Sequence, residues 1–127
     1  MLKSDFKKFF YIILINKVKY ILIKRLKPEA IKKILNNKEK VRLIDVREEW
    51  ENRIAKIDNS ELIPLSNFIE ASKKLNKDDT LIIYCHRGFR SAQVCFYLEK
   101  LGFSYLINLE GGIDAWSKQI DNSIPLY

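Results

Sequence analysis

The chain has 127 residues, which is enough for one domain with a hydrophobic core and too few for two comfortable ones. Its hydrophobic fraction of 47% is ordinary for a soluble globular protein, but its net charge of +7 is uneven. Residues 1–40 carry 12 Lys or Arg against three acidic residues, whereas residues 41–127 carry 11 basic and 13 acidic residues. A basic arm can bind anions, yet no nucleic-acid-binding motif accompanies it, so no nucleic-acid partner is expected.

The N-terminal extension, residues 1–20, is basic and contains the apolar run Phe9–Ile15, which Asn16 and Lys17 interrupt. A transmembrane helix needs about 20 apolar residues, so no transmembrane span is expected. The run has the length of a signal-peptide core, but no small-residue cleavage site follows it, which argues against export. We expect a helix that lies at a membrane surface or packs on the domain formed by residues 21–127.

The first half of this domain predicts strands and helices in alternation. Strands are expected at 21–26, 41–46 and 62–63. Pro28 suits the first turn of a helix that ends at Asn36-Asn37. Glu48, Glu49 and Glu51 suit the start of a second, short helix.

The second half continues the alternation. Ser66 is a plausible N-cap for a helix through about Leu75, and strands are expected at 81–84 and 105–107. A helix over 91–101 ends at Gly102, and another opens over 112–118. The inward candidates of the 91–101 helix are Ala92, Cys95, Phe96 and Leu98.

This order of elements predicts an α/β fold in which helices cover both faces of a parallel sheet. Ligands bind beyond the carboxyl ends of the strands in such sheets. Asp45 and Cys85 both fall at predicted strand ends.

The most informative stretch is 81–91, where a strand delivers Cys85 into a tight loop that a helix follows at once. The loop amides can form an anion-binding nest, and the helix N-terminus, Arg87 and Arg90 add positive charge. Gly88 permits a positive φ. All of these features favour a nucleophilic thiolate. The alternative is that Cys85 is a small buried hydrophobe, as most free cysteines are; the loop context favours the reactive site.

Two further side chains need an interpretation. Cys95 lies inside a predicted helix and is interpreted as a core residue, with a resolving thiol as the alternative. His86 directly follows the nucleophile and is interpreted as lining the loop or facing solvent, not as a general base.

Two cysteines and one histidine make neither a disulfide framework nor a metal site, and no cofactor is expected. Two free thiols fit a reducing intracellular compartment. The heavy use of isoleucine, lysine and asparagine is typical of an AT-rich genome, which indicates a plastid or otherwise a bacterial cytoplasm.

Three motifs in the same order resemble the rhodanese family. They are Leu43–Glu48 (LIDVRE), the loop 85–91 (CHRGFRS) and Asn108–Trp116 (NLEGGIDAW). The resemblance implies a three-layer fold with a central parallel sheet of about five strands. It also implies an enzyme, a sulfurtransferase in which Cys85 carries sulfane sulfur as a persulfide. The persulfide loop would comprise His86, Arg87, Gly88, Phe89, Arg90 and Ser91.

The resemblance also assigns supporting roles. Asp45 and Arg47 are implied to form an architectural polar network near the loop, the alternative being a pair that only starts the following helix. Gly111 and Gly112 are implied to form a tight turn, and Trp116 an aromatic anchor in the core.

Loop length bears on which group is transferred. Four residues separate Cys85 from Arg90, as in the sulfurtransferases of this superfamily, whereas the related phosphatases and arsenate reductases have one more. The implied donor is thiosulfate or a protein persulfide. The C-terminal third is similar to the rhodanese domain of molybdopterin-synthase sulfurylases, which implies a small sulfur-carrier protein as an acceptor.

One stretch departs from the family. Residues 55–60 read AKIDNS where the family has Gly-His-Ile-Pro-Gly-Ala, so Asp58-Asn59 is expected to supply the turn instead. Two other functions stay open: a non-catalytic binding module on the same scaffold and, less favoured, a small phosphatase or arsenate reductase.

Overall fold

The computed structural model describes residues 22–37 and 40–127, so the interpretations of the N-terminal extension lie outside the described residues. Five strands form one sheet in the order β1-β5-β4-β2-β3, and every neighbouring pair is parallel. The strands are β1 (Leu22–Leu26), β2 (Val41–Asp45), β3 (Glu61–Leu62), β4 (Thr80–Tyr84) and β5 (Tyr105–Leu109). The predicted parallel sheet of about five strands is confirmed.

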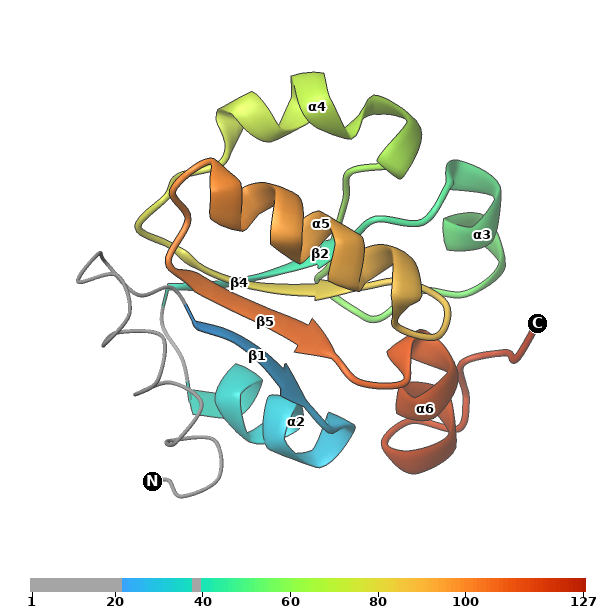
Figure 1. Ribbon diagram of the computed structural model, residues 1–127. Coiled ribbons are helices and arrows are strands. Elements are labelled where there is room, and N and C mark those ends of the chain that lie inside the picture. The colour runs from blue at the N-terminus through green and yellow to red at the C-terminus, as the bar shows by residue number, and fades with distance from the viewer. Residues whose placement is uncertain (1–21, 38–39) are drawn as a thin grey trace.

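Helices cover both faces of this sheet (Figure 1). One face carries α4 and α5, the other carries α2 and α6, and α3 lies beyond the carboxyl end of β2. The helices are α2 (Pro28–Asn37), α3 (Glu49–Ile54), α4 (Phe68–Ala71), α5 (Phe89–Lys100) and α6 (Gly112–Gln119). The predicted three-layer α/β fold is therefore confirmed. Within the described ranges, no helix has the length and apolar character that a membrane crossing requires.

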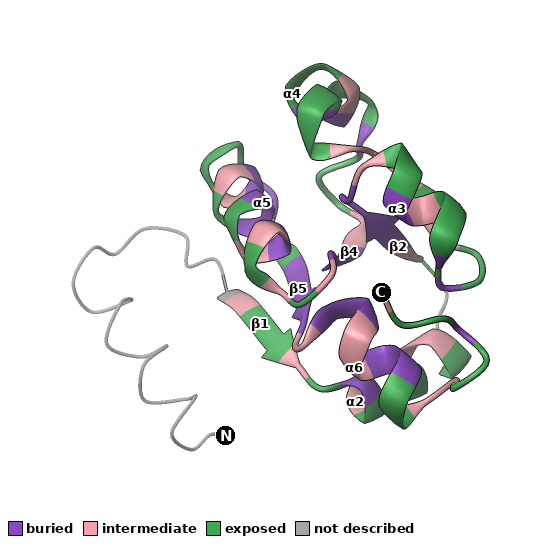
Figure 2. Ribbon diagram, turned by 90° about the vertical axis from the view of Figure 1, so that its right-hand side faces the viewer, coloured by how far each residue is buried: buried purple, intermediate pink, exposed green. Residues whose placement is uncertain are grey.

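Two hydrophobic cores lie on opposite faces of the sheet, because successive side chains of a strand point to opposite sides. In β4, Leu81 and Ile83 pack in the core under α5, while Ile82 and Tyr84 pack in the core with α6. Trp116 of α6 is 4% exposed in the second core, which confirms its prediction as an aromatic anchor. The strands at the centre of the sheet are accordingly buried along most of their length (Figure 2).

The predicted helix from Ser66 to Leu75 is wrong as one element. The chain forms a 3-10 turn (Leu65–Asn67), the short α4 and a second 3-10 turn (Ser72–Lys74). Ser66 is not the N-cap of the first turn or of α4, whose N-caps are Pro64 and Asn67. Its amide and hydroxyl instead donate to the two carboxylate oxygens of Glu48, at 3.1 and 2.7 Å. Asn67 has a non-helical backbone (φ −126°, ψ 18°), which separates the first turn from α4.

The helix α5 begins at Phe89, two residues before the predicted start, and ends at Lys100 with Leu101 as its C-cap. Cys95 and Leu98 are fully buried, as predicted, but Phe96 is 59% exposed. The inward prediction for Phe96 is therefore wrong. The inward row of α5 runs through Val94, Cys95 and Leu98, and Phe96 falls outside it.

The turn at 55–60 is built without the family's residues. Asn59 is the only described non-glycine residue with a positive φ, at 65°, which confirms that Asp58-Asn59 supplies the turn. The buried hydroxyl of Tyr84 lies 2.9 Å from the Ser60 hydroxyl and accepts the Ile57 amide at 3.2 Å. The turn is thus tied to the end of β4, one residue before Cys85.

Candidate active site

Cys85 follows the carboxyl end of β4 and is 1% exposed. The amides of Gly88 and Ser91 donate to its Sγ at 3.1 and 3.3 Å. Gly88 has φ +104°, which lets the chain turn back over the sulfur. Two converging N–H groups form a small cradle that stabilises negative charge on this sulfur.

The N-terminus of α6 supports the same loop from behind. The amides of Ile113 and Asp114 donate to the carbonyls of Cys85 and His86, at 2.9 and 3.1 Å. A Cβ on Gly112 would collide with the His86 carbonyl oxygen and lie 2.6 Å from the Cys85 oxygen. Gly112 is therefore needed for the close approach of α6 to the cysteine loop, and not only for a tight turn.

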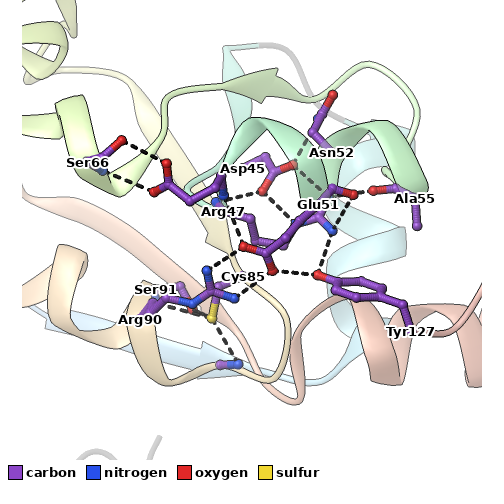
Figure 3. A network of polar contacts seen from close by, with 12 residues as sticks. Asp45, Arg47, Glu51, Asn52, Ala55, Ser66, Cys85, Arg90, Ser91 and Tyr127 are labelled. Atoms are coloured by element: carbon purple, nitrogen blue, oxygen red, sulfur yellow. Dashed lines mark hydrogen bonds and ion pairs between the residues drawn. The ribbon is translucent and has the colours of Figure 1, made fainter.

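Arg90 of the loop is held by a carboxylate from α3 (Figure 3). Its two guanidinium Nη atoms donate to the two Glu51 oxygens at 2.7 and 2.9 Å. Glu51 is 3% exposed, and burial alone would raise its pKa, but hydrogen bonds from Arg90, the Glu48 amide and Tyr127 lower this pKa to about 2. The sequence predicted a positive charge on Arg90 beside Cys85, and the structure pairs that charge with the Glu51 carboxylate.

Asp45 and Arg47 form a fully buried ion pair. Arg47 donates to the Asp45 carboxylate through Nε and Nη2 at 2.9 and 2.7 Å, and also to the Ala55 carbonyl at 2.6 Å. Burial opposes the charge on Arg47, yet the bonds to Asp45 and Tyr127 hold its pKa above the usual value. The pair joins β2 to the segment after α3, beside the loop.

Tyr127 links the two ion pairs. Its hydroxyl accepts from Arg47 at 2.9 Å and donates to Glu51 at 2.8 Å, as Figure 3 shows. Burial raises the pKa of Tyr127 to about 12, so the hydroxyl keeps its proton at neutral pH. The end of the described chain accordingly lies between α3 and α6 in both ribbon views.

The remaining loop side chains point to different surroundings. The His86 ring stacks on Tyr127 with centroids 4.1 Å apart, and its Nε2 is buried without a hydrogen-bond partner among the described residues. Arg87 is exposed, and Phe89 is 80% exposed. Of the predicted loop residues, Gly88 and Ser91 are the ones with hydrogen bonds to the sulfur.

Three residues of the site were not identified from the sequence. Glu51 was interpreted only as an acidic residue at a helix start, Asn108 only as the first residue of the third motif, and Tyr127 lies in the C-terminal third without a role assigned to it. Asn108 accepts from the Ser91 hydroxyl at 2.6 Å and donates to the Gly88 carbonyl at 3.2 Å. One signal was available: Asn108 is a polar residue inside an otherwise apolar strand, and such a residue needs a buried partner.

Cys95 is fully buried in the core, which confirms its interpretation as a core residue. Burial raises its pKa to about 12. Within the described residues, no group of three or more His, Cys, Asp or Glu side chains could hold a metal ion.

Comparison with known proteins identifies one family. The profile of the rhodanese-like domain matches residues 27–119. The chain is 40% identical over 102 residues to the probable adenylyltransferase/sulfurtransferase MoeZ of Mycobacterium tuberculosis, covering 79% of this chain and 26% of that protein. The chain thus spans about a quarter of that relative.

Two further likenesses involve domains of similar size. The putative sulfurtransferase YtwF of Bacillus subtilis is 36% identical over 94 residues, covering 74% of this chain and 90% of that protein. The crystal structure of a rhodanese-like domain protein from Staphylococcus aureus is 32% identical with a TM-score of 0.70, covering 82% of this chain and 98% of that one. The matched profile and the names of these relatives together support a role of the sulfurtransferase type.

Proposed function

Because the chain belongs to the rhodanese-like domain family, we propose that it is a sulfurtransferase enzyme that carries sulfane sulfur as a persulfide on Cys85. The observation that carries this proposal is the convergence of the Gly88 and Ser91 amides on Sγ, at 3.1 and 3.3 Å. Donors preorganised around a buried sulfur stabilise the anion that sulfur transfer creates and consumes. The loop, with four residues between Cys85 and Arg90, supports sulfur over phosphate as the transferred group.

The reaction has two halves. The Cys85 thiolate bonds to the outer sulfur of thiosulfate, the donor's sulfur–sulfur bond breaks, and sulfite leaves with the bonding electron pair. A nucleophile of the acceptor then bonds to the outer sulfur of the persulfide. The persulfide bond breaks, and the electron pair returns to Cys85 as a thiolate. A protein persulfide donor would react in the same way, with its own thiolate leaving in place of sulfite.

The supporting roles follow from the same geometry. Gly88, Arg90 and Ser91 shape the loop, and Asp45 and Arg47 fix the strand and segment beside it. His86, Arg87 and Phe89 lie around the outer part of the loop, and of these Arg87 and Phe89 are exposed and available to a donor or acceptor.

The test is the mass of the protein after incubation with thiosulfate or with a small-molecule persulfide. One added sulfur atom is expected on Cys85, and cyanide should remove it as thiocyanate. Cys85→Ser should gain no sulfur, whereas Cys95→Ser, the matched control, should react as the wild type does. A wild-type chain that gains no sulfur from either donor would overturn the proposal and leave the non-catalytic binding module.

The natural acceptor is proposed to be a small sulfur-carrier protein. The likeness to a protein named as both adenylyltransferase and sulfurtransferase supports this. An adenylated carboxylate is an electrophile, so with this acceptor the outer sulfur of the persulfide is the nucleophile: it bonds to the acyl carbon, AMP leaves, and an acyl disulfide to Cys85 forms. An external thiol then reduces that disulfide, which releases the carrier thiocarboxylate and returns Cys85 as a thiolate. Transfer of labelled sulfur from the loaded chain to an adenylated carrier, but not to the carrier without adenylation, is the expected result.

The location is proposed to be a plastid, on the basis of the composition rich in isoleucine, lysine and asparagine. Detection of the chain by mass spectrometry in purified plastids, against the other cell fractions, tests this. Its recovery from the other fractions alone would contradict it.

A further inference from the structure

A buried polar chain lies behind the nucleophile. The Ser91 Oγ is 3.3 Å from the Cys85 Sγ and 2.6 Å from the Asn108 Oδ1. Asn108 Nδ2 in turn donates to the Gly88 carbonyl at 3.2 Å. Ser91 is 0% exposed and Asn108 is 4% exposed, so water does not replace these bonds.

The direction of each bond in this chain follows from the donors and acceptors available. A carbonyl oxygen has no proton, so the Gly88 carbonyl requires the NH₂ end of Asn108. The opposite amide orientation would place two acceptor oxygens together. The Asn108 oxygen therefore faces Ser91 and receives its hydroxyl proton.

The consequence falls on Cys85. A serine hydroxyl has one proton, and in this chain that proton is committed to Asn108. At 3.3 Å from the sulfur, the Ser91 oxygen presents a lone pair. It can accept a hydrogen bond from the Cys85 thiol, but it cannot donate one to the thiolate. Among the described residues, the donors to this sulfur are then the Gly88 and Ser91 amides.

We propose that Asn108 is a positioning residue for sulfur transfer, because it keeps the Ser91 hydroxyl proton turned away from Cys85. The Ser91 oxygen then accepts a hydrogen bond from the Cys85 thiol, and the thiolate is stabilised by the two backbone amides. This inference rests on the proposed function for its biological meaning. Its physical content, the direction of one hydroxyl, can be tested without sulfur transfer. Asn108 thereby sets which side of the Ser91 hydroxyl faces the sulfur.

The first experiment is the pH profile of Cys85 alkylation by iodoacetamide, followed by intact-mass spectrometry. Asn108→Ala frees the Ser91 proton to turn toward the sulfur, so the profile should move to lower pH. Alkylation near neutral pH should rise about fivefold, the ratio that one hydrogen bond of ordinary strength supplies. Asn108→Asp keeps an acceptor for Ser91 and adds a negative charge, so its profile should move to higher pH.

Ser91→Ala gives an independent sign. If the Ser91 hydroxyl accepts a hydrogen bond from the thiol, removing that hydroxyl moves the alkylation profile to lower pH. If the hydroxyl donates to the thiolate instead, removing it moves the profile to higher pH, which overturns the proposal. In the Ser91→Ala background, adding Asn108→Ala should leave the profile unchanged. Because Ser91→Ala creates a smaller cavity than Asn108→Ala, it still decides the sign if the asparagine variant does not fold.

Two other outcomes contradict the proposal. Shifts of Asn108→Ala and Asn108→Asp in the same direction would indicate a structural role only. A shift by Asn108→Ala that persists without the Ser91 hydroxyl would show that Ser91 is not the intermediary. Sulfur loading is measured separately in the same samples. If the variants show the expected shifts in their alkylation profiles but the wild type gains no sulfur, the proposed function is contradicted and this inference stands.

Discussion

The protein buries two free thiols, and they differ in what surrounds the sulfur. Cys85 is 1% exposed and Cys95 is 0% exposed, so accessibility does not distinguish them. Two backbone N–H groups donate to the Cys85 sulfur, whereas Cys95 lies in the apolar core, where burial raises its pKa to about 12. Donors aimed at the sulfur, and not burial, separate a candidate nucleophile from a core residue.

The largest expected difference between the two thiols is in alkylation. A pKa of about 12 leaves about one Cys95 thiol in 10⁵ ionised at pH 7. A small reagent should therefore label Cys85 faster by orders of magnitude, and Cys85→Ser should remove nearly all labelling of the folded protein. Peptide mapping measures this, with Cys95→Ser as the control. Equal labelling of both positions would erase the distinction.

The next test compares two glycines, Gly112 beside the loop of Cys85 and Gly102 after the helix that carries Cys95. Gly112→Ala places a methyl group against the carbonyls of Cys85 and His86, so it should displace the cysteine loop. Displacement of a reacting group by about 1 Å can cost about 100-fold in rate, and a loss of that order in persulfide formation is expected.

Gly102 follows α5, which carries Cys95, and is the matched control. It shares a positive φ, at +100°, but the three heavy atoms nearest to a Cβ there belong to the flexible Lys77 side chain, the first of them at 3.5 Å. Gly102→Ala should cost about 1 kcal/mol of stability and leave sulfur transfer unchanged. Equal rates of persulfide formation in the two alanine variants would contradict the role assigned to Gly112.

Glu51→Gln should destabilise the protein at the contact between α3 and Arg90 of the cysteine loop. It breaks a paired carboxylate, and a loss of about 2 kcal/mol in the free energy of unfolding is expected. The pKa of Glu51 is lowered from 4.5 to about 2, so its contribution is complete above about pH 4.5 and is lost as pH falls toward 2. The stability difference between wild type and variant should therefore narrow below about pH 4.5.

Urea unfolding over a pH series measures this difference. Glu49→Gln breaks the pair with Arg53, in which both side chains are more than half exposed, and should change stability little at any pH. A difference between wild type and Glu51→Gln that is constant from neutral pH to pH 3 would contradict the assignment.

The smallest effect is expected at Cys95. Cys95→Ser buries a hydroxyl in an apolar core and should cost about 1 kcal/mol of stability, seen as a lower midpoint in urea. The rate of persulfide formation on Cys85 should not change. A persulfide that persists longer in the folded variant than in the wild type would favour the other interpretation of Cys95, as a resolving thiol that attacks the persulfide once it has formed.

Local sequence was sufficient for much of the fold. Short apolar runs marked the strands that end beside Asp45 and Cys85, and Pro28 and Gly102 marked helix ends, because these signals depend on backbone chemistry within a few residues. Local sequence did not predict the structure correctly where a side chain hydrogen-bonds to a residue distant along the chain. Ser66 is a residue type that favours the N-cap position, but its hydroxyl donates to Glu48, 18 residues away, and the predicted helix is broken.

By itself, then, the sequence determined the parallel α/β frame and the place of Cys85 in a tight loop between a strand and a helix. Only the tertiary structure decided what surrounds that cysteine. Glu51 reaches Arg90 across 39 residues, and Asn108 reaches Ser91 across 17. The physical reason is that hydrogen-bond direction and charge compensation depend on groups that come together only when the sheet and helices pack.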